Sequence, residues 1–390
     1  MSQVFSEEIL SSLGGNAAMG HVLDTTSGDT SMGDIQPFTA THRGRTISVA
    51  HNGSITNLQA LHRDLQADGA IFRSGIAGEV IAHLLARCGD LNLDAALQSV
   101  FAGIEGAYSM LLMVDDTLIA VRDSHGFRPL CLGRLHNGGY VVASETCALD
   151  LIEAQYLRDV EPGEILLMDA EGLRSIHLAP ESPRFCLFEQ VYFSRPDSAI
   201  FGVDVYKSRK RMGEVLAREC RVDADLVIPF PDSGTYAALG YAQAAGLPFE
   251  MGLVRNHYIG RTFLPSVRIG RELAVRMKLN PVRSLLRGKR VVIVDDSAIS
   301  GATVSIKIRS LREAGAREVH LLVSCPPIRF SCDYGINFPA PDLLLANNGS
   351  VTEIRDSLGL DTLYYLSLQG LLKAAGGGET SYCTACMNSQ

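Results

Sequence analysis

The chain has 390 residues, a formal net charge of −8, and 46% hydrophobic against 20% charged residues. This length allows two separate cores, and the composition is that of a globular protein. The acidic balance excludes nucleic acid and anionic membrane as expected main partners, and no apolar run approaches the ~20 residues of a membrane span. The first residues lack the apolar stretch of a signal peptide, so we expect a cytoplasmic protein.

Strand patterns dominate the first half, from about residue 47 to residue 173, and helical patterns interrupt them at residues 60–66 and 79–87. This mixture predicts an α+β layered domain in which helices cover sheets. A proline-rich break at residues 180–183 follows, after which strands and helices alternate. Such alternation predicts a doubly wound parallel sheet. The predicted domains are residues 1–180 and 181–390.

In the second half, the β-branched residues 291–294 predict a buried parallel strand, and two carboxylates, Asp295 and Asp296, follow it directly. A turn of small residues at 300–303 then opens a helix. Ligands in open α/β sheets bind at the carboxyl ends of strands, and such a turn presents backbone N–H groups to a phosphate. The paired acids suit ribose hydroxyls or a divalent cation. Together these features resemble the signature of type I phosphoribosyltransferases, which use phosphoribosyl pyrophosphate (PRPP); an ordinary strand–turn–helix is the alternative.

A second turn, residues 231–234, follows another predicted strand at residues 225–229. Alone it would be a plain turn, but in the same sheet as Asp295 it becomes a candidate pyrophosphate loop. Residues 255–290, between the two loops, carry ten Lys or Arg residues and one acid. A basic run is usually a solvated face. Here its charge matches a pyrophosphate-bearing substrate, which favours a lid that closes over PRPP.

Longer motifs extend the resemblance to nearly the whole chain. Those in the second half are FEQVYFSRPDS, VYKSRKRMGEVLA, PDSGTYAALGYA, RNHYIGRTF, KLNPVRS and VVIVDDS. Those in the first half are GHVLDTTSG, IQPF, AHNGSITN, RDSHGFRPL and YVVASETCAL. They resemble the glutamine–PRPP amidotransferase family, whose members join a glutaminase to a phosphoribosyltransferase. The resemblance implies a truncated N-terminal-nucleophile-type layered αββα domain followed by a type I phosphoribosyltransferase sheet.

The resemblance also implies roles for residues of the transferase site. Catalysis would involve Asp295, Asp296 and Arg261, and the two aspartates would hold Mg²⁺. The PRPP-binding residues would be Ser233, Gly234, Lys278, Asp295, Asp296, Ser297, Ser300, Gly301, Ala302 and Thr303. The family has an arginine where this chain has Ser300 and a threonine where it has Ala302, a difference that favours nucleobases as acceptors.

In the first half the resemblance breaks at the groups that would bind and cleave glutamine. The family's nucleophile is a cysteine at the mature N-terminus, whereas the first cysteine here is Cys88. Leu23 stands where the family has an arginine that holds the glutamine carboxylate, and Ala77 where it has an aspartate that anchors the amine. Asn52–Gly53 remains at the position of the oxyanion hole, although Asn-Gly also favours a two-residue hairpin turn, which is the preferred interpretation. We therefore expect a structural remnant without glutaminase activity.

Cys383 and Cys386 form a metal-type pair near the end of the chain. The resemblance adds Cys186 and Cys332, because some members of the family carry a [4Fe–4S] cluster on four cysteines at these positions. Zinc is the competing metal, and four buried thiols are the alternative without a metal.

The favoured function is a PRPP-dependent phosphoribosyltransferase that transfers the 5-phosphoribosyl group to a purine-like or deazapurine-like base and releases pyrophosphate. The runner-up is an ammonia-dependent amidophosphoribosyltransferase that makes 5-phosphoribosylamine. A PRPP-binding regulator without turnover and a subunit fed by a separate glutaminase are the further alternatives. Expected partners are PRPP, Mg²⁺ and a small nitrogenous acceptor, in a homo-oligomer, with no nucleic acid and no membrane.

Overall fold

The computed structural model describes residues 6–22, 35–89, 91–178, 182–256, 279–376 and 381–388. The chain divides into two compact units, which are described separately. Unit 1 comprises Met1–Ser144, Val160–Pro183 and Asp333–Gly335, and unit 2 comprises the remaining residues. Within the described part of the chain, no helix is both long and apolar enough to cross a membrane.

The division between the units differs from the predicted boundary after residue 180, because residues 145–159 group with unit 2. Hydrogen bonds from a later segment hold them there. Glu145 accepts a hydrogen bond from the backbone N–H of Arg195 at 2.8 Å, and Thr146 accepts one from that of Ala199 at 2.9 Å.

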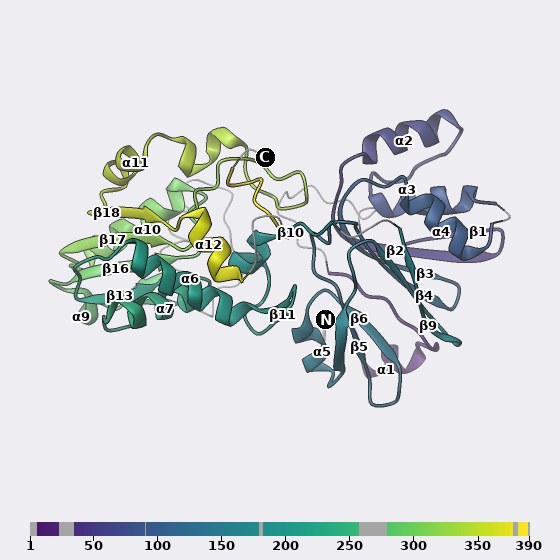
Figure 1. Ribbon diagram of the computed structural model, residues 1–390, viewed down its shortest axis with the longest axis horizontal. Helices are drawn as coiled ribbons and strands as arrows, with labels where there is room; N and C mark the ends of the chain where they lie inside the picture. Colours follow the sequence, from purple (N-terminus) through teal and green to yellow (C-terminus); the bar gives the residue numbers. More distant parts are fainter. Residues whose placement is uncertain are drawn as a thin grey trace. The chain divides into compact units, whose positions relative to one another are not determined.

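Unit 1 is built on a six-stranded antiparallel sheet in the order β1-β2-β3-β4-β8-β9, with α2, α3 and α4 on one face (Figure 1). The strands of this sheet are β1 (Phe38–His42), β2 (Arg45–Ile55), β3 (Gly106–Val114), β4 (Thr117–Arg122), β8 (Glu164–Asp169) and β9 (Gly172–His177). Unit 1 also contains β5 (Cys131–Arg134) and β6 (Tyr140–Ala143), which pair antiparallel with each other. Its helices are α1 (Glu7–Ser12), α2 (Leu58–Ala67), α3 (Ala77–Arg87) and α4 (Leu93–Phe101). Side chains alternate along β4: Ile119 and Val121 pack in the core that includes α3 and α4, while Ala120 packs with Leu132 of β5 on the other face.

Unit 2 is built on a parallel sheet in the order β13-β16-β17-β18, with α6, α7 and α12 on one face and α10 and α11 on the other (Figure 1). Its sheet strands are β13 (Leu226–Pro229), β16 (Arg290–Asp295), β17 (Glu318–Val323) and β18 (Thr362–Tyr365). Its helices are α5 (Thr146–Leu151), α6 (Val205–Glu219), α7 (Thr235–Ala245), α9 (Arg283–Leu286), α10 (Gly301–Glu313), α11 (Val351–Leu358) and α12 (Leu368–Ala375). The short strands are β7 (Gln155–Asp159), β10 (Phe185–Cys186), β11 (Ala199–Ile200), β12 (Val203–Asp204), β14 (Leu253–Arg255), β15 (Leu279–Pro281) and β19 (Tyr382–Cys383). Residues 291–294 are fully buried, as their unbroken apolar run predicts, and the predicted parallel sheet is confirmed.

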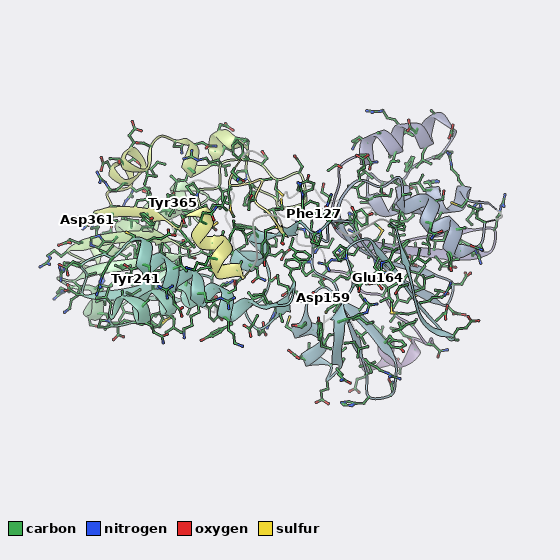
Figure 2. All side chains as sticks on the ribbon, viewed as in Figure 1. Phe127, Asp159, Glu164, Tyr241, Asp361 and Tyr365 are labelled. Atoms are coloured by element: carbon green, nitrogen blue, oxygen red, sulfur yellow. The ribbon has the colours of Figure 1, made fainter. Side chains whose placement is uncertain are left out.

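Two glycines let α6 and α7 meet backbone to backbone. A Cβ atom at Gly213 would lie 1.8 Å from the carbonyl oxygen of Ala237, and one at Gly240 would lie 2.0 Å from that of Lys210. Tyr241, labelled in Figure 2, is fully buried beside this crossing and donates its hydroxyl to the backbone carbonyl that ends α6, at 3.0 Å. The two helices are therefore joined at a separation that only glycine permits.

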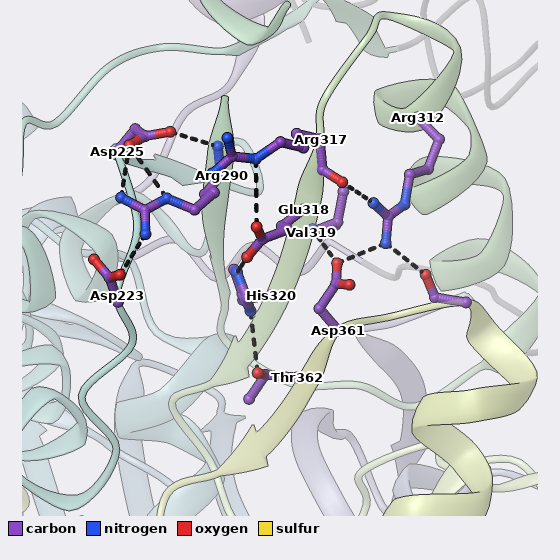
Figure 3. Close-up of polar contacts among 11 residues, drawn as sticks. Asp223, Asp225, Arg290, Arg312, Arg317, Glu318, Val319, His320, Asp361 and Thr362 are labelled. Atoms are coloured by element: carbon purple, nitrogen blue, oxygen red, sulfur yellow. Dashed lines mark hydrogen bonds and ion pairs between the residues drawn. The ribbon is translucent and has the colours of Figure 1, made fainter. Parts of the chain in front are cut away.

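Ion pairs close the amino-terminal edge of the parallel sheet (Figure 3). The guanidinium of Arg290 donates to Asp225 at 2.9 Å, and this contact holds the pKa of Asp225 at about 2. Just before β18, Asp361 accepts hydrogen bonds from Arg312 of α10 at 2.6 Å and from the backbone N–H of Val319 in β17 at 2.7 Å. The charged side chains at this edge are therefore used in structural ion pairs and hydrogen bonds, and the candidate ligand-binding residues are at the opposite edge.

Candidate active site

The carboxyl-terminal edge of the same sheet carries the acid pair. Asp295 ends β16 and Asp296 follows it, with exposed fractions of 6% and 5%. On the side of β13 that faces away from β16, Phe249 forms a parallel bridge with Val227. After β13 the chain therefore continues towards this edge of the sheet, whereas after β16 it continues to β17 on the opposite side. Ligands of such sheets bind where the strand order reverses, which here is between β13 and β16.

Gly234 brings the predicted pyrophosphate loop against the acid pair. A Cβ atom at Gly234 would lie 2.4 Å from the carbonyl oxygen of Val294 and 3.2 Å from Cα of Asp295. Its φ of −72° and ψ of −8° are open to any residue. The close approach, and not the backbone conformation, therefore requires glycine.

Asp295 is held on several sides by the protein. Its Oδ1 accepts a hydrogen bond from the backbone N–H of Asp296 at 3.0 Å, and its carbonyl oxygen accepts one from the backbone N–H of Ser324 at 2.9 Å. Its Oδ2 lies 3.8 Å from Nζ of Lys307. Burial raises the pKa of Asp295, and the Lys307 ammonium opposes that rise.

Asp296 has one carboxylate oxygen without a hydrogen-bond partner among the described residues. Its Oδ1 accepts hydrogen bonds from the backbone N–H of Ser297 and from the Ser297 hydroxyl, the latter at 3.0 Å. Its Oδ2 is buried and has no hydrogen-bond partner among the residues that the structure describes. Burial raises the pKa of Asp296, and the hydroxyls of Ser233 and Ser297 act in the opposite direction. A buried oxygen without a partner is costly, and a ribose hydroxyl or a divalent cation would satisfy it.

The turn after the acid pair opens α10 in the way an anion site requires. Ser300 is the N-cap residue in an extended conformation, and its side chain makes no capping hydrogen bond. The first N–H groups of a helix have no acceptor within the helix, so those of Gly301, Ala302 and Thr303 can point at a phosphate. Ala302 and Thr303 are exposed, so a ligand can reach them.

Two cations near the acids were not predicted: Arg209, which is buried, and Lys307, whose side chain is 15% exposed. Arg209 of α6 donates to the carbonyl oxygens of Gln190 at 2.9 Å and Ser194 at 2.6 Å. Burial lowers the pKa of Arg209, and the charge of Asp296 opposes this effect. Lys307 of α10 contacts the other acid, as described above.

Both cations leave a trace in the sequence that periodicity could have found. Arg209 lies on the buried face of α6 together with Val205 and Met212. Lys307 lies one turn after Val304, on a helix whose buried residues include Leu311. A charge on the apolar face of a helix points to a buried partner or a site.

Several predicted lid residues, Arg261 and Lys278 among them, lie outside the described residues. At the start of the basic segment, Arg255 forms an ion pair with Asp232 of the predicted pyrophosphate loop. At its end, Arg290 pairs with Asp225 at the opposite edge of the sheet. Assigning Arg290 to the lid is therefore wrong, because its charge is used in a structural ion pair.

The four predicted cluster cysteines lie near one another in unit 2. Cys186 and Cys383 are register partners in the β10–β19 pair. Burial raises the pKa of the Cys386 thiol, and Cys186, Cys332 and Cys383 raise it further. Nevertheless, across the described ranges no three or more His, Cys, Asp or Glu side chains are arranged to hold a metal ion. The predicted [4Fe–4S] cluster is thus not supported by the arrangement of these thiols.

In unit 1, Asn52–Gly53 does not form the predicted hairpin turn. Both residues lie inside β2, where Asn52 pairs with Ser109 and Gly53 with Tyr108 of β3. A Cβ atom at Gly53 would lie 2.0 Å from the carbonyl oxygen of Ala107, which explains the glycine without a turn. The hairpin interpretation is wrong because the strand continues through both residues. Ala77 is the buried first residue of α3, and Leu23 lies outside the described residues.

The fold and the acid pair of unit 2 define a phosphoribosyltransferase. Comparison with protein families gives a glutamine amidotransferase domain at residues 23–151 and a phosphoribosyl transferase domain at residues 217–330. The chain is 49% identical to amidophosphoribosyltransferase 2, chloroplastic, of Arabidopsis thaliana, over 99% of this chain and 69% of the relative. It is 43% identical to the amidophosphoribosyltransferase of Mycobacterium tuberculosis, over 100% of this chain and 76% of the relative.

Solved structures give the same result for the whole fold. One, described as the allosteric regulatory enzyme of purine biosynthesis, matches with a TM-score of 0.94 and 42% identity, over 100% of this chain and 85% of that one. The glutamine PRPP amidotransferase of B. subtilis, complexed with ADP and GMP, matches with a TM-score of 0.89 and 42% identity, over 95% and 82%. The chain belongs to the amidophosphoribosyltransferase family.

Proposed function

We propose that the chain transfers the 5-phosphoribosyl group of PRPP to ammonia, forming 5-phosphoribosylamine and releasing pyrophosphate. The observation that carries the proposal is the buried Asp296 Oδ2 without a described partner, close before the open N-terminus of α10. The names of the relatives favour an amine product over the purine-like base that Ser300 and Ala302 suggested.

The described residues supply binding, orientation and electrostatic stabilisation in this proposal. The first N–H groups of α10 would hold the 5-phosphate, and the turn at residues 231–234 would hold the pyrophosphate. Positive charge develops at the ribose as its C1–O bond to pyrophosphate breaks, and the carboxylates of Asp295 and Asp296 would stabilise that charge. The lone pair of ammonia forms the C1–N bond, and one proton passes to solvent. Mg²⁺ held by Asp296 and the substrate would neutralise pyrophosphate charge.

Free ammonia is the proposed nitrogen source because two glutamine-binding groups implied by the family resemblance are replaced. Leu23 and Ala77 carry no charge, so neither can pair with the carboxylate or the amine of glutamine. Ala77 is also buried as the first residue of α3. Glutamine is the competing source, and the experiment below distinguishes the two.

The test follows pyrophosphate release from PRPP and Mg²⁺ with ammonium, glutamine or a panel of purine-like bases. We expect release with ammonium, rising between about pH 7 and about pH 9 as neutral ammonia increases. Asp296→Asn should abolish release, while Asp116→Asn, at an exposed aspartate of unit 1, should not. Release with glutamine at low ammonium would overturn the proposed nitrogen source. Release with bases alone would overturn the proposed acceptor, and PRPP binding without any release would indicate a regulator.

A [4Fe–4S] cluster on Cys186, Cys332, Cys383 and Cys386 is a separate proposal, supported by the proximity of the thiols and not by their arrangement. Iron and sulfide analysis of protein prepared without oxygen tests it. Four irons per chain, lost in Cys383→Ser, is the expected result. Iron-free protein with unchanged activity would exclude the cluster.

A further inference from the structure

A largely buried lysine of α10, Lys307, lies beside the acid pair. Lys307 lies about two turns after the N-terminus of α10, and its side chain is 15% exposed. Its Nζ is 3.8 Å from Asp295 Oδ2 and 3.8 Å from the centroid of the Phe230 ring. A lysine this buried needs compensation for its charge, and the carboxylate and the face of the ring both provide it.

The two acids of the pair therefore have different surroundings. Both oxygens of Asp295 face the protein, one towards the N–H of Asp296 and the other towards Lys307. Asp296 has an oxygen without a partner among the described residues. A ligand that engages Oδ2 of Asp296 displaces no hydrogen bond to that oxygen among the described residues, whereas a ligand at Asp295 would compete with Lys307.

We infer that Lys307 is a positioning residue that fixes the carboxylate of Asp295 against α10, so that Asp296 is the acid that meets the ribose and its cation. The inference rests on the proposed function, since PRPP is the ligand. Lys307 and the phosphate-facing turn belong to the same helix, so the contact with Asp295 also sets the distance between that turn and the acid pair.

Removing the lysine has a second electrostatic consequence. Asp295 and Asp296 are adjacent like charges, and PRPP is an anion, so the loss of a nearby positive charge makes their approach less favourable. Free Mg²⁺ can offset part of this repulsion. A variant without the lysine should therefore bind PRPP weakly at low Mg²⁺ and recover part of its affinity at high Mg²⁺.

The experiment measures PRPP binding by calorimetry, without an acceptor, at low and high Mg²⁺. Asp296→Asn should weaken PRPP binding about 100-fold, because it removes the charged acceptor of a hydrogen bond from the ligand. Asp295→Asn should weaken it less than about tenfold, because both oxygens of Asp295 face the protein. Lys307→Met should weaken binding about 10- to 100-fold at low Mg²⁺, and Lys307→Arg, which keeps the charge, should remain within about fivefold of the natural protein. Lys373→Met, at an exposed lysine of α12, is the matched control and should bind normally.

The double variant Lys307→Met with Asp295→Asn tests whether the lysine acts through Asp295. Binding no weaker than that of Lys307→Met alone supports the inference, and fully additive losses overturn it. Equal losses in Asp295→Asn and Asp296→Asn also overturn it, and this comparison decides the question if Lys307→Met fails to fold. No PRPP binding by the natural protein would overturn the proposed function itself, which separates the two failures.

Discussion

The tightest contact at the site predicts a large effect from the smallest possible substitution, Gly234→Ala. The new Cβ would lie 2.4 Å from the carbonyl oxygen of Val294, about 1 Å inside an ordinary contact. The backbone of Gly234 suits alanine, so no conformational strain is added and the whole effect comes from this overlap. Relieving it must move the turn away from Asp295. Overpacking of this kind costs about 1–3 kcal/mol of stability, and a shift of about 1 Å at a reacting centre can cost about 100-fold in rate.

Urea unfolding and pyrophosphate release measure the two parts of this prediction. We expect Gly234→Ala to lose about 1–3 kcal/mol of unfolding free energy and about 100-fold in kcat/KM. Gly75→Ala is the control, because a Cβ atom at Gly75 meets no atom within 4 Å. If Gly234→Ala were as stable and as active as Gly75→Ala, the close approach would not define the site.

Three further substitutions test other contacts. Asp225→Asn removes a carboxylate that Arg290 holds at a pKa of about 2, below its ordinary value of 3.8. The stability that this ion pair contributes is fully present above about pH 4 and is lost as the pH falls through about 2. The difference in unfolding free energy between Asp225→Asn and the natural protein should therefore shrink to nothing between these pH values, and a constant difference would contradict the ion pair. Arg209→Met removes the buried cation near Asp296 and should therefore weaken PRPP binding in calorimetry. It should also lower the free energy of unfolding by about 1–3 kcal/mol, because two backbone carbonyls lose their hydrogen-bond donor. Gly213→Ala places a Cβ atom 1.8 Å from a carbonyl oxygen of α7 and should lower the Tm by several degrees in scanning calorimetry, whereas an unchanged Tm would mean that the helices can separate.

The parallel sheet and the position of its acids could be predicted because their signals are local. An unbroken β-branched run ends in Asp295 and Asp296, and small residues then open a helix, so strand, acids and turn follow one another within the chain. The predicted helices at residues 60–66 and 79–87 were similarly visible as periodic patterns, and they correspond to α2 and α3.

The missed features depend on contacts between distant residues. The position of Lys307 and Arg209 on apolar helix faces is visible in the sequence, but which acid each of them meets is determined only by the folded chain. Asn52–Gly53 suggested a turn by its local preference, but the carbonyl of Ala107 in the paired strand determines the glycine. The grouping of residues 145–159 with unit 2 likewise rests on hydrogen bonds to a segment some 50 residues later.

The glycine crossing of α6 and α7 limits how this protein can vary. Arg209 projects from one of these helices, and the turn that approaches the acids leads into the other. With main chain touching main chain at Gly213 and Gly240, no side chain lies between the two helices at the crossing to absorb an insertion or a change of volume. Substitutions on the outer surfaces of these helices should therefore leave the position of the acids unchanged. A relative that lost either glycine would need a compensating increase in the spacing between the two helices.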